Sequence, residues 1–198
     1  MILKNSEILL TEPRGFCAGV ERAIEIVNRA VEVFDETIFV KHEVVHNKHV
    51  IEQLVEKGVV FVESLDTVPD QSILIYSAHG VSKEISELAT KKRLKVFNAT
   101  CPLVTKVHFE IHKFASQNID VVLVGHSGHP EVEGTMGQYI SEKGKIHLIE
   151  TNDDIDKLKI ENRNIAYVTQ TTLSVDDTKS IVSCLRDKFP NIIGPRKD

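Results

Sequence analysis

Short apolar runs alternate along the chain with longer stretches in which apolar residues recur every three or four positions. The short runs lack strict alternation, which favours strands covered on both faces, and the longer stretches have helical periodicity. This rhythm predicts an α/β fold with mainly parallel sheets. Strands are expected at residues 7–11, 37–40, 59–62, 72–76, 94–97, 120–124, 145–149 and 165–168.

Three helices have clear starting signals. Asn47 can cap the first, Ser174 opens a capping-box pattern before the second, and Pro102 suits the first turn of the third, where its missing N–H costs nothing. Gly58 closes the first helix. The apolar faces comprise Val50, Ile51, Leu54 and Val55 in the first helix and Ile181, Val182, Leu185 and Phe189 in the second.

The arrangement of strands suggests two domains. Five expected strands precede Cys101 and three follow it, and 198 residues can build either one large domain or two small ones. We therefore predict two consecutive α/β domains, residues 1–101 and 102–198. The first carries the loops with Cys17, His46 and His79, and the second carries the loops with His129, Glu131 and Thr171.

Composition narrows the class of partner. Lys and Arg number 24 against 29 Asp and Glu, and no stretch concentrates the basic residues, so nucleic acid is not expected as a partner. The longest apolar runs are far shorter than the roughly 20 residues that cross a bilayer. The N-terminus has scattered charge in place of a signal peptide's apolar core, so we expect a cytoplasmic protein without a membrane partner.

Residues capable of chemistry follow the strands. In parallel α/β sheets, ligands collect beyond the carboxyl ends of strands, where loops lead into helices. Six expected strands are followed there by Cys, His, Glu or Thr. The residues concerned are Cys17, His46, His79, Cys101, His129 with Glu131, and Thr171.

The cysteines indicate a metal site. Cys17 and Cys101 fall where helices begin, a position that stabilises a thiolate. Cys184 lies on the apolar face of an expected helix, and we interpret it as a core residue. Two cysteines do not complete an iron-sulfur site, which takes four, or three where one iron is left for substrate.

Histidine pairs leave a zinc site open as an alternative. His42 and His46 match the H-E-x-x-H pattern of zinc proteases, although a strand leads directly into it and Asn47 starts the next helix. His126 and His129 could also share a metal, but Gly and Pro favour a turn there. Ordinary surface or packing roles are expected for His49, His108, His112 and His147.

Longer motifs carry a family resemblance. The segments PRGFCAGVERAI, KHEVVHNKHV, YSAHGVS, FNATCPLVTKVH, GHSGHPEVEGTMGQ, VTQTTLSVDDT and GPRKD occur in this order from about residue 7 onward. In order and spacing the chain resembles the 4-hydroxy-3-methylbut-2-enyl diphosphate reductase family, also called LytB. The resemblance implies a trefoil-like assembly of three α/β domains around a [4Fe-4S] cluster, of which this chain holds the first two.

The resemblance also implies site roles. Cys17 and Cys101 match two cluster ligands, and the third is expected beyond Asp198. His46, His79 and His129 match diphosphate-binding or substrate-pocket residues, Glu131 the proton source, and Thr171 a residue that orients the substrate hydroxyl. Protonated imidazole is expected to supply the charge that meets the diphosphate.

The implied reaction is the reductive dehydration of 4-hydroxy-3-methylbut-2-enyl diphosphate to isopentenyl and dimethylallyl diphosphates, the last step of non-mevalonate isoprenoid synthesis. Ferredoxin or flavodoxin is the implied electron donor. We expect the chain as given to be truncated, to bind a cluster poorly or not at all, and to have little activity alone. A zinc hydrolase and a non-enzymatic cluster-binding fragment are the competing hypotheses.

Overall fold

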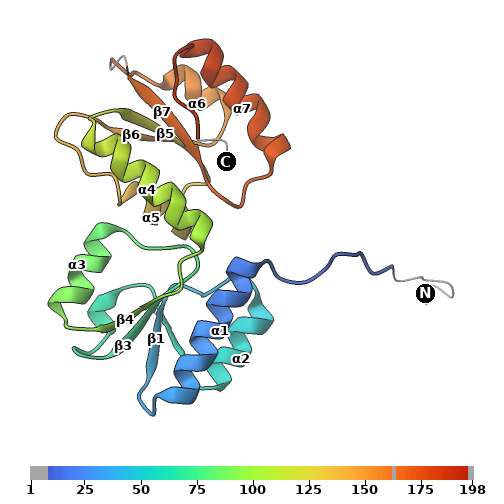
Figure 1. Ribbon diagram of the computed structural model, residues 1–198, viewed down its shortest axis with the longest axis vertical. Coiled ribbons are helices and arrows are strands. Elements are labelled where there is room, and N and C mark those ends of the chain that lie inside the picture. Colours follow the sequence, from blue (N-terminus) through green and yellow to red (C-terminus); the bar gives the residue numbers. More distant parts are fainter. Residues whose placement is uncertain (1–8, 162–163, 196–198) are drawn as a thin grey trace.

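Two parallel sheets follow one another along the chain (Figure 1). The computed structural model describes residues 9–161 and 164–195. The first sheet has the order β2-β1-β3-β4, and the second has the order β6-β5-β7. The predicted α/β class with parallel sheets is confirmed. The strands are β1 (Ile38–Lys41), β2 (Val60–Val62), β3 (Ile73–Tyr76), β4 (Lys95–Asn98), β5 (Asp120–Val124), β6 (Ile146–Ile149) and β7 (Ile165–Thr169).

Helices cover both faces of each sheet, and we call each sheet with its helices a lobe. In the first lobe, α1 and α2 pack on one face and α3 on the other; in the second lobe, α4 and α5 share a face opposite α6 and α7. None of the helices in the described ranges is long and apolar enough to cross a membrane. The helices are α1 (Ala18–Val33), α2 (Lys48–Glu56), η1 (Leu65–Thr67, a 3-10 turn), α3 (Lys83–Lys91), α4 (Pro102–Ser116), α5 (Pro130–Met136), α6 (Asn152–Lys157) and α7 (Val175–Lys188).

The central strands explain the missing alternation in the sequence. Every residue of β3 and of β5 is buried, because helices cover both of their faces. By contrast, all four residues of β4 are exposed, since β4 lies at the edge of the first sheet. Parallel sheets covered on both faces therefore produce the continuous apolar runs from which the strands were predicted.

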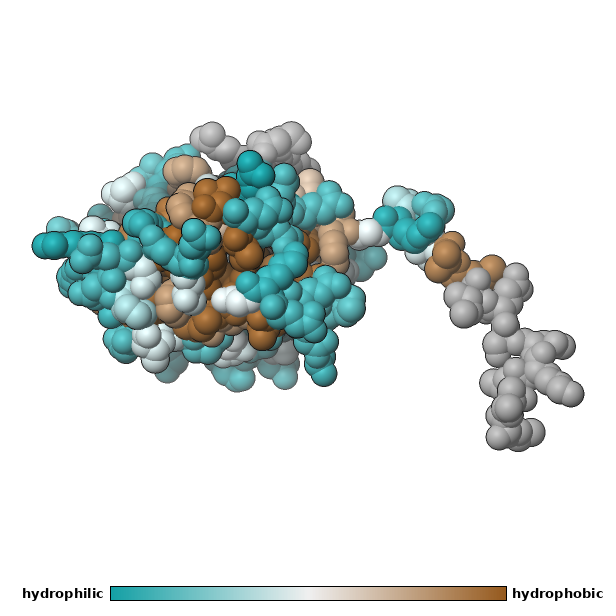
Figure 2. Space-filling model, turned by 90° about the horizontal axis from the view of Figure 1, so that it is seen from below, coloured by the Kyte–Doolittle hydropathy of each residue, from teal (hydrophilic) through white to brown (hydrophobic). Residues whose placement is uncertain are grey.

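One predicted strand is not found. Residues 9–11 form no strand, and residues 7–8 of that prediction lie outside the described part of the chain. Leu9 and Leu10 are 80% and 70% exposed, and the segment stands away from the body of the molecule in both Figure 1 and Figure 2. An apolar run becomes a strand only where a sheet edge can pair with its backbone groups, and this segment contacts no described sheet edge.

The predicted helix starts are confirmed. Asn47 accepts a hydrogen bond from the backbone of Val50, Ser174 caps α7, and Pro102 occupies the first position of α4. Val55, expected on the apolar face of α2, is instead 53% exposed, because the buried stripe of this short helix is centred on Val50 and Leu54.

Cys184 packs against the core of the second lobe, as predicted. The chain leaves the first sheet after Asn98 and enters α4 at Pro102, and α4 packs against β5 and α5. This path supports the proposal that the two domains comprise residues 1–101 and 102–198.

Glycines on and after α5 bring the two lobes together. A Cβ added at Gly137 would lie 2.2 Å from Ser82 Cβ, and one at Gly134 would lie 3.4 Å from the backbone of Gly80. Gln138 donates from Nε2 to the carbonyl of Val81 at 2.7 Å. The loop that follows His79 is thus seated directly on the helix that follows His129.

Candidate active site

Two thiols lie at helix starts in the region between the lobes. Cys17 is the N-cap of α1 and Cys101 is the N-cap of α4, and neither side chain bonds to its own helix. A Cβ on Gly19 would lie 2.7 Å from Cys101 Sγ and 3.9 Å from Cys17 Sγ. Both sulfur atoms therefore border one small space that a larger residue at Gly19 would fill. Their position at helix starts suits thiolates that bind a metal.

Backbone contacts hold the thiols in place. Arg22 on α1 donates to the carbonyls of Thr100, at 3.1 Å, and Asn98, at 3.3 Å. This arginine ties the helix that begins at Cys17 to the segment that leads into Cys101. The backbone N–H of Cys101 donates to the carbonyl of Ala78 at 2.9 Å. Because Ala78 precedes His79, one hydrogen bond and one residue connect the thiol region to the histidine region.

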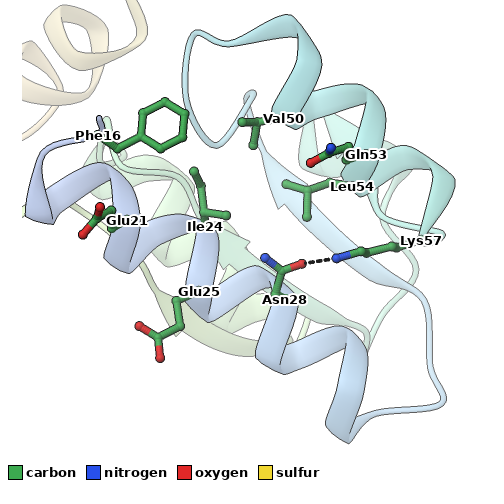
Figure 3. Close-up of a pocket in the computed structure, with 9 residues that line it drawn as sticks. All are labelled: Phe16, Glu21, Ile24, Glu25, Asn28, Val50, Gln53, Leu54 and Lys57. Atoms are coloured by element: carbon green, nitrogen blue, oxygen red, sulfur yellow. Dashed lines mark hydrogen bonds between the residues drawn. The ribbon is translucent and has the colours of Figure 1, made fainter. Parts of the chain in front are cut away.

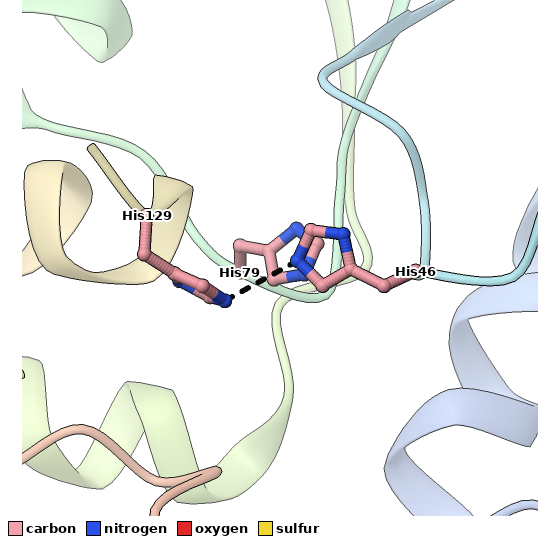
Figure 4. A group of neighbouring side chains, drawn as sticks. All are labelled: His46, His79 and His129. Atoms are coloured by element: carbon pink, nitrogen blue, oxygen red, sulfur yellow. Dashed lines mark hydrogen bonds between the residues drawn. The ribbon is translucent and has the colours of Figure 1, made fainter. Parts of the chain in front are cut away.

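Three imidazoles from three loops converge on one another (Figure 4). His46 lies between β1 and α2, His79 follows β3, and His129 is the N-cap of α5. The ring centroids of His46 lie 4.4 Å from His79 and 5.1 Å from His129, and those of His79 and His129 are 5.5 Å apart. The structure thus brings together the three histidines that the family resemblance grouped.

Burial favours the neutral form of His79 and His129. Burial, together with the smaller effect of the nearby rings of His46 and His129, lowers the pKa of His79 to about 3. Burial, followed by the proximity of His46 and His126, also lowers the pKa of His129. Without a ligand, both shifts favour the neutral form of His79 and His129. The expectation that protonated imidazole meets a bound diphosphate stays a prediction.

The hydrogen bonds of His129 determine what it presents to the cavity. Its Nδ1 lies 3.1 Å from the backbone N–H of Glu131, which can only donate, so Nδ1 is the acceptor. The ring proton of neutral His129 must then be on Nε2, which lies 3.2 Å from Nε2 of His46. His129 consequently directs a donor toward its neighbours, which suits an anion. A metal ion would need a lone pair there.

Glu131 is a buried acid held by one residue. It is 2% exposed, the backbone N–H of Thr171 donates to its Oε1 at 2.6 Å, and the Thr171 hydroxyl lies 3.0 Å from Oε2. Burial raises the pKa of Glu131, although the two bonds from Thr171 oppose the shift. The contact joins two residues 40 positions apart that the sequence selected separately.

Gln170 is a buried residue that the sequence did not single out. Its Oε1 accepts from the backbone N–H of His126 at 3.0 Å, and its Nε2 donates to the Thr172 hydroxyl at 2.8 Å. It therefore ties the loop before His129 to the loop that carries Thr171. The sequence signal that could have identified Gln170 is its position in the T-Q-T-T motif, from which only Thr171 was selected as a candidate.

Two adjoining cavities open next to the histidines. One of about 280 Å³ is lined by residues that include His46 and His79, and the other, of about 260 Å³, by residues that include Lys41 and Ser82. They share the walls made by His42, Glu63, Pro130 and Glu133.

A wider hollow of about 450 Å³ lies between α1 and α2 (Figure 3). Phe16 lines one part of it, and Lys57 donates to Asn28 at another. None of its lining residues is a cysteine or histidine. The volume of a cavity therefore does not by itself indicate where the candidate site residues lie.

The H-E-x-x-H segment does not form a zinc-protease helix. His42 has a left-handed backbone (φ 62°) and contacts Lys41 and Glu63, whereas His46 joins the other two imidazoles. His126 Nδ1 lies 3.4 Å from Glu150 Oε2, and the carbonyl of His126 accepts from the backbone N–H of His129 at 3.2 Å. His42 and His46 thus have different side-chain partners, whereas His126 and His129 are neighbours in one turn whose side chains contact different residues.

Comparison with known proteins places this arrangement in a family. The family model described as LytB protein matches residues 8–198. The chain belongs to the LytB family. Among LytB relatives, it is 60% identical over 193 residues to the 4-hydroxy-3-methylbut-2-enyl diphosphate reductase of Methylococcus capsulatus and 58% identical to that of Aeromonas salmonicida. Each match covers 97% of this chain and 62% of the relative, so the LytB chain spans about three fifths of the length of these curated relatives.

Solved LytB structures agree with the fold. The chain matches the E-1-hydroxy-2-methyl-but-2-enyl-4-diphosphate reductase of Plasmodium falciparum with a TM-score of 0.86 and 46% identity over 93% of this chain and 57% of that one. A second structure, of (E)-4-hydroxy-3-methyl-but-2-enyl diphosphate reductase, matches with a TM-score of 0.80 and 30% identity, covering 95% of this chain and 66% of the other. The family assignment thus rests on both sequence and fold.

Proposed function

We propose that this chain forms part of an iron-sulfur reductase that converts 4-hydroxy-3-methylbut-2-enyl diphosphate to isopentenyl and dimethylallyl diphosphates, the last step of the non-mevalonate pathway. One observation carries the proposal: two thiols border one space, three imidazoles from both lobes meet, and a buried carboxyl group lies two residues after one of these imidazoles. The names of the relatives support the same reaction.

The thiol region fits a [4Fe-4S] cluster as far as its residues go. Cys17 and Cys101 would hold two irons, and the absent side chain of Gly19 leaves space beside both sulfur atoms. A cluster with one iron left open for substrate takes three thiolates, so it requires one more thiolate besides Cys17 and Cys101. When bound, such a cluster would pass two electrons, one at a time, from an external donor to the substrate, and would offer a Lewis-acidic iron to the allylic hydroxyl.

The three histidines would bind the diphosphate. His129 already directs its Nε2–H toward His46, and a phosphate oxygen can replace His46 as the acceptor. Since His79 and His129 are neutral before binding, the incoming negative charge favours their protonation. Binding should therefore be accompanied by proton uptake, which strengthens the hydrogen bonds just when the anion is present.

Glu131 would deliver the proton that allows the hydroxyl to leave as water. Its raised pKa favours retention of that proton, and Thr171 holds both carboxyl oxygens in one orientation. A general acid must be fixed within hydrogen-bond reach of the leaving oxygen. The Thr171 hydroxyl is the group best placed to orient the substrate hydroxyl toward Glu131.

The remaining assignments follow from this reaction. The electron donor would be a small ferredoxin or flavodoxin, and the location would be the cytoplasm. No nucleic-acid partner is proposed, because the sequence has no concentrated basic segment.

Anaerobic turnover tests the proposal in a protein of the full length of the relatives. With a chemical reductant, such a protein should contain iron and labile sulfide and release both isomeric diphosphates, and Cys101→Ser should abolish both properties. A colourless protein with about one zinc per chain, unable to turn over the substrate after reconstitution, would overturn the proposal and favour a hydrolase.

A further inference from the structure

Lys41 is a buried lysine to which the proposed reaction gives no role. It is the last residue of β1 and is only 4% exposed. Burying an ammonium group is costly unless charged or polar neighbours compensate it. The neighbours of Lys41 therefore indicate what it does.

Lys41 forms a cluster with His42 and Glu63, here called the Lys41 cluster. The Lys41 Nζ atom lies 2.5 Å from Nε2 and 3.3 Å from Nδ1 of the His42 ring. On the other side, His42 Nδ1 lies 2.6 Å from Glu63 Oε2. A carboxylate accepts, so the ring proton is on Nδ1, and a neutral imidazole separates the ammonium from the carboxylate.

The Lys41 cluster sits at a strained turn. His42 has a φ of 62°, a left-handed conformation that is unfavourable for a residue with a side chain. Its backbone N–H donates to the carbonyl of Val62 at 3.0 Å, and its ring is held between Lys41 and Glu63. Backbone and side chain of His42 thus both anchor this turn.

The turn begins the loop that carries His46. Val44 is completely buried, and its carbonyl lies 3.4 Å from the backbone N–H of Ala78, the residue before His79. The Lys41 cluster is therefore connected to His46 along the chain and to His79 through one backbone contact.

The cavities give the same connection in space. His42 and Glu63 line the cavity that contains His46 and His79, and they also line the adjoining one that contains Lys41. The Lys41 cluster thus lines the cavities next to the imidazoles but is not part of the group formed by His46, His79 and His129.

We propose that Lys41, His42 and Glu63 are positioning residues for the anion site: by fixing the turn at His42, they hold His46 and His79 where a diphosphate can contact both. This inference rests on the proposed function, which supplies the diphosphate.

A charge comparison distinguishes positioning from electrostatics. Glu43 and Glu63 are carboxylates lining the same cavity, but of these two only Glu63 bonds to His42. If only charge mattered, removing either carboxylate would strengthen the binding of an anion. If Glu63 acts by holding His42, its removal should weaken binding.

The experiment measures inorganic pyrophosphate binding to this chain by calorimetry. Glu63→Ala and His42→Ala should weaken binding about 10-fold, the scale on which supporting residues act on a bound group. Glu43→Ala should bind equally or more tightly. His42→Gln should recover most of the affinity, because its amide can donate to Glu63 and accept from Lys41. Equal or tighter binding by Glu63→Ala would overturn the proposal.

A second measurement separates this proposal from the proposed function. Nitrogen-15 spectra of the imidazoles report the protonated nitrogen of each ring without any ligand. Glu63→Ala should alter the His46 and His79 signals, and Glu43→Ala should leave them unchanged. If the unmodified chain fails to bind pyrophosphate, the diphosphate site is wrong, and these spectra still decide the positioning role: unaltered His46 and His79 signals in Glu63→Ala would refute it.

Discussion

The thiol region and the histidine-glutamate region differ in how far the described residues complete them. Cys17 is exposed and Cys101 half-buried, and neither side chain caps its helix. Glu131 and His79 are 2% and 7% exposed, and each lies among polar partners. The groups that would hold the substrate and its proton already have side-chain and backbone partners, whereas the thiols that would bind a metal do not cap their helices.

The difference has a physical cause. Neutral imidazoles and a protonated carboxyl group can be buried at modest cost when they are hydrogen-bonded. Thiolates carry full charge, and a metal is what compensates it. A chain can therefore preorganise the first region without a metal, and the two regions should be separable by mutation.

The largest expected effect is on turnover and involves only the proton. In the cluster-loaded protein of full length, Glu131→Gln should reduce kcat by about 10²–10⁴-fold, because general acid catalysis contributes on that scale. Pyrophosphate affinity should change less than about twofold, since Glu131 is not one of the three residues proposed to bind the diphosphate. Single-turnover kinetics with calorimetry measures both, and unchanged turnover would remove Glu131 as the acid.

The next effect concerns the contact between the lobes. Gly137→Ala places a methyl group 2.2 Å from Ser82 Cβ, so we expect a loss of up to about 3 kcal/mol in the free energy of unfolding. Pyrophosphate binding should weaken as well, because His79 and His129 come from opposite lobes. Gly134→Ala, with its nearest contacts at 3.4 Å, is the matched control. Urea unfolding curves that coincide for both variants would contradict this account.

A smaller effect is expected from acid. The pKa values of His79 and His108 are lowered in the folded chain to about 3 and about 4, chiefly by burial. Below about pH 6.5 the unfolded chain binds more protons, so the free energy of unfolding falls as the pH is lowered toward 4. At pH 5 each histidine should account for about 2 kcal/mol of that loss.

Unfolding at pH 7 and pH 5 checks this pH dependence. His79→Asn and His108→Asn should each lose less stability than the parent between the two pH values, and the exposed His49→Asn is the control. Identical losses in all four proteins would rule out the neutral buried imidazoles as the cause.

The smallest effect tests the independence of the two regions. Cys17→Ser with Cys101→Ser should eliminate iron binding in the full-length protein but change pyrophosphate affinity in this chain by less than about twofold. The contact described between Cys101 and the segment of His79 is a backbone hydrogen bond, which serine preserves. A large loss of pyrophosphate affinity would show that the two regions form one unit.

The sequence predicted most of the fold because periodicity and capping are local signals. Seven of the eight strands appear near their expected places, and Asn47 and Ser174 cap as expected. These local signals could not decide whether residues 7–11 form a strand, since an apolar run does not reveal whether a sheet edge is available to pair with it.

The site was only partly accessible to sequence reasoning. Family motifs grouped His46, His79 and His129, but the lowered pKa values of His79 and His129 depend on burial, which sequence spacing does not express. His42 attracted attention as a zinc ligand, yet its partners are Lys41 beside it and Glu63 on the next strand end. Close approaches such as that of Gly137 to Ser82 depend on how the lobes meet.

The hydrogen bond between Cys101 and Ala78 has a consequence for substrate length. It ties the segment of His79 to the segment of Cys101 by one backbone contact of 2.9 Å. Under the proposed function, this contact would hold the diphosphate site at a constant distance from the thiols that would bind the cluster. An analogue one carbon longer would then bind by its phosphates and place its hydroxyl away from the cluster.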